Sequence, residues 1–282
     1  MIKPTRPSNI DPETVAGFGE EWVAFDQESL PTDDLTDQFD DYFHIFPFDR
    51  LGAGAVGFDL GCGSGRWALE MAPRVGLLHC IDPSEKALGV ARRKLAAATN
   101  VRFHQASVDS IPLADQSQDF GYCLGVLHHV PDTLAGLKDA AGKLKPGAPF
   151  LLYLYYALDD RPAWFRRLWK ATDLARRFIS RQPFRVRKVL AEAIAATVYW
   201  PVARGAALAE RAGKDVRHWP LAWYRNGSFY RMRTDALDRF GTRLEQRFTK
   251  AEVEHMMGQA GLVDIRFSDR APFWCAVGFR KQ

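Results

Sequence analysis

The chain has 282 residues, of which 47% are hydrophobic and 26% are charged, and its net charge is +4. This length allows one large domain or one domain with an insertion, and no stretch reaches the roughly 18 apolar residues of a membrane-spanning helix. The four cysteines lack metal-ligand spacing, and the polar N-terminus, with Pro4 and Pro7, does not read as a signal peptide. We therefore expect a cytoplasmic enzyme with reduced thiols and no metal site.

The first predicted elements are two helices within residues 1–54. Phe18, Trp22 and Phe25 recur at helical spacing, and a second apolar series of the same kind begins at Phe39. Amphipathic helices of this kind commonly pack on the edge of a sheet.

A short apolar strand that ends at Asp59 runs directly into Gly61, Gly63 and Gly65. A sharp turn from strand to helix needs residues without a Cβ atom, and it lets the backbone approach a ligand closely. A dinucleotide fingerprint would need glycine where Arg66 stands, and the Gly-Lys-Ser/Thr of a phosphate-binding loop is absent. The loop therefore suits a ligand without a pyrophosphate, although it could also be an ordinary glycine-rich turn.

A second buried strand, over residues 76–82, ends at Asp82. A carboxylate at the end of the strand adjacent to a glycine loop can accept both hydroxyls of a ribose. Asp82 could instead cap the next helix, with Glu85 completing a capping box, and the two roles are compatible.

With these residues the chain resembles the class I S-adenosylmethionine-dependent methyltransferases, in particular the branch that includes the ubiquinone and menaquinone biosynthesis enzymes. The resemblance spans about 55–156 and resumes near 234–282. It implies that S-adenosylmethionine is the cofactor and that Asp82 binds its ribose. It also implies a glycine loop around the methionine part and an Asp59 that supports the amino group. The cofactor-binding residues expected here are Asp59, Gly61, Cys62, Gly63, Gly65, Asp82 and Pro83.

The strand over 101–105 leads into Ser107, Val108 and Asp109. In the family an aspartate usually stands at the position of Ser107 and contacts the adenine amino group. The backbone N–H of Val108 can still reach the adenine, whereas Ser107 is a poorer acceptor for an amine. Asp109 could take over the polar role, or it could be a solvated loop residue.

A further buried strand, from residue 119, leads to a Leu-His-His-Val string that the family commonly carries. The resemblance places Leu124 and Gly125 beside the methionine arm of the cofactor. It also places His128 and His129 near the methyl group, and we take His129, then His128, as the candidate base. Either histidine could instead cap a helix or lie hydrogen-bonded in the core.

The remaining elements complete an α/β fold. Asp132 is expected to cap a helix, and Thr249 and Glu252 form a capping box before a helix that Gly261 ends. Strands alternate with helical stretches, which predicts a doubly wound, mostly parallel sheet. The resemblance implies seven strands, the last antiparallel. The predicted segments are an N-terminal lid (1–54), a cofactor-binding core (55–156), a helical insertion after the fifth strand (157–233) and a C-terminal part of the core (234–282).

The insertion is basic and aromatic. Between residues 161 and 233 there are 17 Lys and Arg against four Asp and Glu, a net charge of +13 that leaves −9 on the rest of the chain. We expect Pro183, Pro201 and Pro220 to break its helices. Such a segment suits an anionic membrane surface or an acidic substrate, or its charges simply solvate a helical cap. No nucleic-acid-binding motif accompanies the charge, so we expect no nucleic acid partner.

Aromatic and guanidinium side chains that combine flat surface with polar tips predict where the acceptor binds. In the insertion these are Tyr224, Arg225 and Tyr230, and in the lid they are Trp22 and Tyr42. We expect O- or N-methylation of an anionic acceptor, either a small molecule or a lipid- or glycan-linked compound, by an enzyme that could touch the inner face of the membrane. Two alternatives remain: a non-methylating enzyme with the same cofactor pocket, and a non-catalytic regulator that binds the cofactor.

Overall fold

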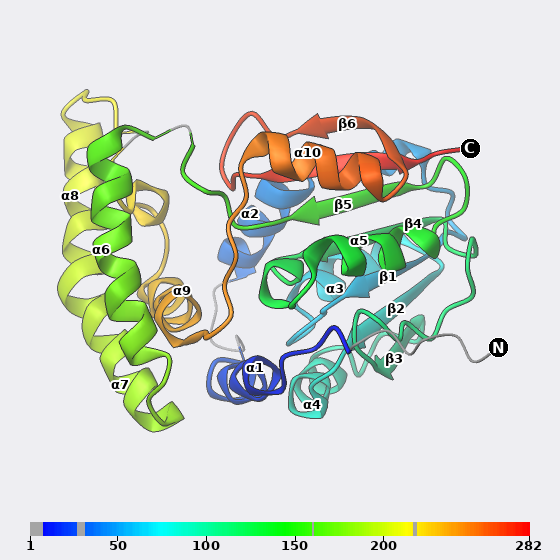
Figure 1. Ribbon diagram of the computed structural model, residues 1–282, viewed down its shortest axis with the longest axis horizontal. Helices are drawn as coiled ribbons and strands as arrows, with labels where there is room; N and C mark the ends of the chain where they lie inside the picture. The colour runs from blue at the N-terminus through cyan, green and yellow to red at the C-terminus, as the bar shows by residue number, and fades with distance from the viewer. Residues whose placement is uncertain (1–7, 27–31, 160, 217–218) are drawn as a thin grey trace.

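The computed structural model describes residues 8–26, 32–159, 161–216 and 219–282, so that Pro4 and Pro7 lie outside the described residues. A seven-stranded sheet forms the centre of the molecule, in the order β3-β2-β1-β4-β5-β7-β6 (Figure 1). β1 to β5 are parallel, and β7 is antiparallel to both of its neighbours, which confirms the predicted sheet. The strands are β1 (Val56–Leu60), β2 (Leu77–Asp82), β3 (Val101–Gln105), β4 (Phe120–Leu124), β5 (Pro149–Tyr153), β6 (Leu262–Phe267) and β7 (Cys275–Arg280).

Helices cover both faces of the sheet because its central strands are apolar on both sides. α5 and α10 pack over Phe58 and Phe150 on one face, whereas α2 and α3 pack over Phe120 and Tyr122 on the other. The helices of the core are α2 (Thr32–Phe43), α3 (Arg66–Met71), α4 (Glu85–Lys94), α5 (Thr133–Gly142) and α10 (Lys250–Gln259).

The local signals for helix ends are mostly confirmed. Asp132 caps α5, and Thr249 forms a capping box with Glu252 at the start of α10. Gly261 follows α10 with a φ of +79°, the conformation expected just after a helix. The cap of α4 is Ser84 rather than Asp82, which leaves Asp82 free for another role.

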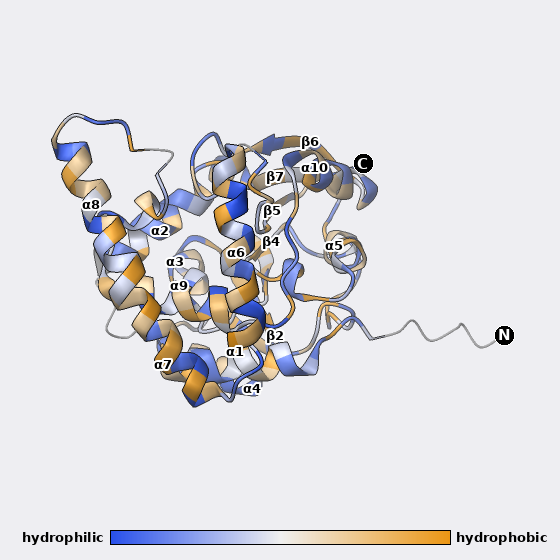
Figure 2. Cartoon of the chain, turned by 60° about the vertical axis from the view of Figure 1, so that its left-hand side comes forward, coloured by the Kyte–Doolittle hydropathy of each residue, from blue (hydrophilic) through white to orange (hydrophobic). Residues whose placement is uncertain are grey.

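One end of the sheet carries a layer of helices that we call the cap, residues 161–241 (Figure 1). It comprises α6 (Ala163–Ile179), α7 (Phe184–Ile194), a π-helical turn (Ala195–Tyr199), α8 (Trp200–Arg211), a short 3-10 turn (Ala222–Tyr224) and α9 (Phe229–Gly241). α9 runs past residue 233 and packs on α6 and α7. Apolar and polar residues alternate along α6 and α7 (Figure 2), which makes both helices amphipathic, and α6 buries the charged Asp173 and Arg176.

The predicted helix break at Pro201 is wrong. Pro183 does precede α7, and Pro220 lies in a loop, but the chain stays helical through Pro201. Pro201 stands in the first turn of α8, directly after the π-helical turn, where a missing backbone N–H removes no regular α-helical hydrogen bond.

The N-terminal helix α1 (Pro12–Ala24) lies between α4 and α9, and so joins the core to the cap (Figure 1). Phe25, just after α1, is fully buried among cap residues. The four cysteines are free and buried. Within the described ranges, no helix is long and apolar enough to cross a membrane, and no cluster of three metal-binding side chains occurs.

Candidate functional site

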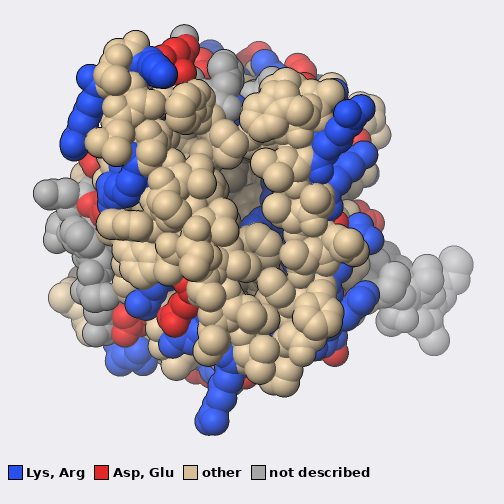
Figure 3. All heavy atoms as spheres, turned by 90° about the vertical axis from the view of Figure 1, so that its left-hand side faces the viewer, with Lys and Arg blue, Asp and Glu red and all other residues tan. Residues whose placement is uncertain are grey.

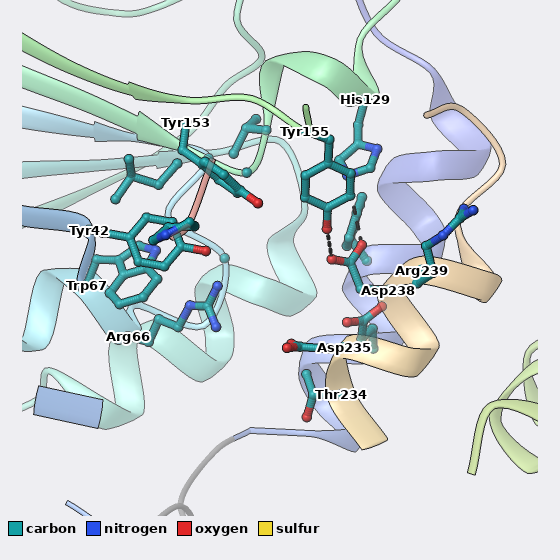
Figure 4. A pocket seen from close by; sticks show the side chains of 18 of the residues that line it. Tyr42, Arg66, Trp67, His129, Tyr153, Tyr155, Thr234, Asp235, Asp238 and Arg239 are labelled. Atoms are coloured by element: carbon teal, nitrogen blue, oxygen red, sulfur yellow. Dashed lines mark hydrogen bonds and ion pairs between the residues drawn. The ribbon is translucent and has the colours of Figure 1, made fainter. Parts of the chain in front are cut away.

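A cavity of about 850 Å³ lies at the carboxyl ends of β1, β2, β4 and β5. α1 and the cap close its other sides, and Figure 4 shows side chains from the core and from α9 facing each other across it. In open α/β sheets ligands bind at this edge, and the volume is typical of a site for small molecules.

The glycine loop forms part of the cavity wall with its backbone. Gly61 and Gly63 have φ of +78° and +53°, which favour glycine. A Cβ atom on Gly61 would lie 2.3 Å from the Val126 side chain, and one on Gly63 would lie 2.9 Å from the Trp22 indole nitrogen. Cys62 also lines the cavity. The loop therefore brings main-chain atoms, rather than side chains, close to a ligand.

Gly65 has a different place from the one expected. It also has a positive φ, +75°, but it does not line the cavity. A Cβ atom there would approach Ala91 and Leu95 of the α4 region at 3.1 Å. Gly65 therefore permits close packing of the loop on α4, and contact with the cofactor is left to the preceding residues.

Asp82 faces the cavity with its carboxylate held by the backbone. Its Oδ2 accepts the Gly63 N–H at 3.0 Å, and its Oδ1 accepts the Ser84 N–H at 2.8 Å. Burial raises the pKa of Asp82 to about 6, and these two N–H groups offset part of that effect. At neutral pH the group is thus an oriented anion with lone pairs left for ribose hydroxyls. Pro83, next in sequence, lines the same cavity.

Asp59 lies behind the loop and does not line the cavity. Burial raises its pKa to about 8, and the neighbouring Tyr122 hydroxyl offsets part of that rise. Its Oδ2 has no hydrogen-bond partner in the part of the chain that the structure describes. Asp59 is therefore largely protonated at pH 7, and any effect on the cofactor would pass through the loop.

The loop after β3 holds both an expected and an unexpected contact. Ser107 and Val108 line the cavity, as an adenine site requires, but Asp109 does not. Asp109 instead accepts the Asn9 backbone N–H at 2.6 Å and a hydrogen bond from the Ser107 hydroxyl. The Asn9 side chain exchanges two further hydrogen bonds of 2.8 Å with the backbone of Asp132. Asp109 thus anchors the segment before α1, and Asn9 lines the cavity.

His129 lines the cavity, and its two ring nitrogens, both buried, have different surroundings. Its Nδ1 lies 2.7 Å from the backbone oxygen of Leu244. Because a carbonyl oxygen only accepts, we assign the proton to Nδ1, which leaves the lone pair on Nε2. Burial lowers the pKa of His129, so the ring is neutral at pH 7. Nε2 has no hydrogen-bond partner among the described residues and lies 3.9 Å from Asp238 Oδ1.

His128 points away from the cavity. Its ring is fully buried and stacked on Tyr155, with 3.8 Å between ring centroids. Burial also lowers its pKa. His128 therefore has no path to an acceptor, and His129 is the histidine that the fold brings to the site.

Several cavity residues were not expected from the sequence. Tyr155, just beyond β5, donates its hydroxyl hydrogen bond to Asp238 Oδ2. Asp235 and Asp238 project into the cavity from α9, opposite Arg66 at the start of α3 (Figure 4). Glu21 of α1 completes this group. The only sequence signal was the acidic i, i+3 pair on α9, which places both carboxylates on one helix face.

Four of the five expected acceptor-binding residues line the cavity: Trp22, Tyr42, Tyr224 and Arg225. Leu124 and Gly125, expected beside the methionine arm, also line it. Arg225 is bound to Glu210, with 2.8 Å between Nε and Oε2. Tyr230 lies outside, with its ring 5.8 Å from that of Phe25 in the interior of the cap. Tyr230 therefore packs against apolar side chains of the cap and does not line the cavity.

Residues 58–147 match the family model described as a methyltransferase domain. This stretch of the core is therefore a methyltransferase domain. An uncharacterized methyltransferase of Bacillus subtilis, YcgJ, is 33% identical over 104 residues, which cover 36% of this chain and 41% of that protein. The ubiquinone biosynthesis O-methyltransferase of Aromatoleum aromaticum is 35% identical over 124 residues, 40% of this chain and 53% of that protein. The matches thus span about half the length of these relatives.

Solved structures support the fold. The crystal structure of YcgJ has a TM-score of 0.50 at 15% identity and covers 89% of this chain and 100% of that chain. The S-adenosylmethionine-dependent methyltransferase SibL has a TM-score of 0.51 at 17% identity, over 88% of this chain and 55% of that chain.

S-adenosylmethionine is the cofactor of this family, and the cavity residues fit it. The side-chain-free wall at Gly61 and Gly63 leaves room for a ligand against the backbone, and the Asp82 carboxylate suits a ribose.

Proposed function

We propose that the chain transfers a methyl group from S-adenosylmethionine to an oxygen or nitrogen atom of a small-molecule, lipid-linked or glycan-linked acceptor, with His129 as the base. The observation that carries this proposal is His129, which lines the same cavity as the glycine loop and Asp82 and whose buried Nε2 has no hydrogen-bond partner among the described residues. When bound, S-adenosylmethionine supplies an already activated methyl group. The protein then has to hold the acceptor in line and keep water out.

The surroundings of His129 suit proton removal from an acceptor. The backbone oxygen of Leu244 fixes the ring, and Nε2 can take a proton from an acceptor O–H or N–H. The resulting imidazolium would lie 3.9 Å from Asp238 Oδ1, and the Tyr155 hydroxyl holds the other oxygen of that carboxylate. Because burial lowers the pKa of His129, the base form is present even below neutral pH.

Substitution of His129 tests this role. His129→Gln should lower kcat by roughly 10²–10⁴-fold. It should leave S-adenosylhomocysteine affinity unchanged, because His129 is part of neither the glycine loop nor the Asp82 site. His255→Gln, on an exposed position of α10, is the matched control. Full activity of His129→Gln would leave alignment alone to accelerate the reaction.

The basic charge of the insertion supports a membrane contact better than an anionic acceptor. Within the cavity wall, Arg225, Arg239 and Arg247 already have carboxylate partners at 2.8–3.2 Å. The outer face of α6, α7 and α8 instead exposes large apolar side chains. Figure 3 shows Lys and Arg around the uncharged centre of this face. The most exposed are Trp164 (55%), Leu174 (73%), Phe178 (67%), Val189 (65%) and Leu208 (64%).

We therefore propose peripheral binding of this face to an anionic membrane, since basic amphipathic helices insert their apolar side at the headgroup level. Flotation with vesicles that contain anionic lipid should carry the protein upward, and neutral vesicles should not. The double variant Leu174→Ser, Phe178→Ser should stay at the bottom of the gradient. If it floats as the wild type does, this face is not the contact. A concentration-dependent dimer without flotation would instead assign the face to a second copy of the chain.

A further inference from the structure

The part of the cavity lined by α1 and α9, which we call the acceptor half, contains three carboxylates that form no ion pair with Lys or Arg among the described residues. Asp235 and Asp238 come from α9 (Figure 4), and Glu21 comes from α1, so the cap and the N-terminal segment both contribute to this group. Glu21 is only 4% exposed, and its Oε1 has no hydrogen-bond partner in the described ranges. Asp238 Oδ1 is also buried without such a partner. A buried carboxylate oxygen without a donor is unfavourable unless a ligand supplies one.

The basic side chains around these carboxylates are largely engaged elsewhere. Arg187 approaches Glu20, at 3.5 Å, rather than making an ion pair with Glu21. Arg231 stacks on Trp223, with 4.8 Å from its guanidinium carbon to the ring centroid. Arg66 is the cation that faces the group across the cavity, and it stacks on Trp67 at 4.2 Å (Figure 4). Arg66, Arg187 and Arg231 thus act on one or more of the three carboxylates through their charge, but none of them forms an ion pair with these carboxylates among the described residues.

The walls beside these carboxylates are aromatic. Trp22, Tyr42 and Tyr224 line the same cavity, and Phe18 packs on His129 with 4.9 Å between ring centroids. Aromatic faces attract cations, and they do so most strongly away from water. Burial raises the pKa of each of Glu21, Asp235 and Asp238 above its usual range. A bound cation would favour their ionised forms again.

We propose that this part of the cavity binds a positively charged nitrogen of the acceptor, between Glu21, Asp235 and Asp238. The acceptor is then an amine-bearing compound, whatever larger group it is attached to. This inference rests on the proposed methyl transfer, and it replaces the anionic acceptor expected from the +13 charge of residues 161–233. The charge that decides selection is then that of these three carboxylates at the cavity wall, rather than the summed charge of the insertion.

Three probes of similar shape and different charge test the proposal. 2-Phenylethylamine, 2-phenylethanol and 3-phenylpropanoate are titrated by calorimetry into the protein saturated with S-adenosylhomocysteine. The amine should bind at least about tenfold more tightly than the alcohol, and the carboxylate should bind most weakly. Glu21→Gln and Asp235→Asn should each raise the Kd of the amine by about tenfold to hundredfold and leave that of the alcohol unchanged. Glu254→Gln, an exposed carboxylate on α10, is the matched control.

Equal affinities for the amine and the alcohol would overturn the proposal, as would tighter binding of the carboxylate or no amine binding at millimolar concentration. A third result would reassign the carboxylates: if the two variants weaken S-adenosylmethionine but not S-adenosylhomocysteine, they serve the sulfonium of the cofactor. Thermal unfolding and S-adenosylhomocysteine affinity of each variant report on folding. The proposed methyl transfer is tested separately, because it fails only if the cofactor does not bind or no methyl group moves.

Discussion

Replacement of Asp82 by asparagine should separate cofactor binding from stability. The two carboxylate oxygens accept the N–H groups of Gly63 and Ser84 at 3.0 and 2.8 Å. An amide keeps one acceptor and turns an NH₂ group toward the other N–H. Hydrogen bonds to charged groups contribute about 1.5–3 kcal/mol, so the loss of one, together with weaker ribose binding, should raise the Kd of S-adenosylhomocysteine by about tenfold to hundredfold.

Stability should change little in the same variant, because two effects oppose each other. The folded-state pKa of Asp82 is about 6, above its unfolded value, so ionised Asp82 costs stability as pH rises from about 4 to about 6. At pH 7 this cost is of the order of 2–3 kcal/mol, and Asp82→Asn removes it while losing the backbone hydrogen bond. Calorimetric titration with S-adenosylhomocysteine and a thermal melt of the same sample measure both. Unchanged affinity would refute the assigned role of Asp82.

Three further substitutions probe other parts of the site. Gly63→Ala should weaken S-adenosylhomocysteine binding by about tenfold or more, because its Cβ would lie 2.9 Å from the Trp22 indole; Gly142→Ala, which meets open space, should not. Asp59→Asn should flatten the fall of Tm as pH rises from 5 to 9. The folded-state pKa of Asp59, about 8, lies above its unfolded-state pKa, so ionisation of Asp59 lowers the stability of the wild type as pH rises between the two. An unchanged profile of Tm against pH would mean that Asp59 is solvated. Tyr155→Phe should lower kcat several-fold with normal cofactor affinity, because Asp238 loses its donor; equal kcat would remove Asp238 from the mechanism.

The fold was largely predictable because its signals are local. The strand Val101–Gln105, the cap at Asp132 and the capping box of Thr249 and Glu252 each depend on residues within a few positions. The glycine loop is likewise local, and its Gly61 and Gly63 reach the cavity as expected. Local sequence signals could not predict that Gly65 packs against α4 and does not line the cavity, because this depends on how closely α4 approaches the loop.

The acceptor half was less predictable because distant segments build it. Asp109 is 100 residues from Asn9, and its side chain is used by that contact rather than by a ligand. Tyr155 and Asp238 are separated by 83 residues, and their hydrogen bond exists only because α9 returns to the core after the cap. The net charge of the insertion predicted an acidic acceptor, yet charge counted along the sequence does not distinguish the outer face of a helix from the wall of a cavity.

The most direct test of methyl transfer is the fate of a labelled methyl group. The protein is incubated with methyl-labelled S-adenosylmethionine and an extract of the cells from which the gene comes, beside a His129→Gln sample that still binds S-adenosylhomocysteine. We predict that label enters an extractable product with the wild-type protein and that the amount of labelled product falls by roughly 10²-fold or more with the variant. Tight cofactor binding with no labelled product in any extract would contradict it and favour a regulatory protein that only binds the cofactor.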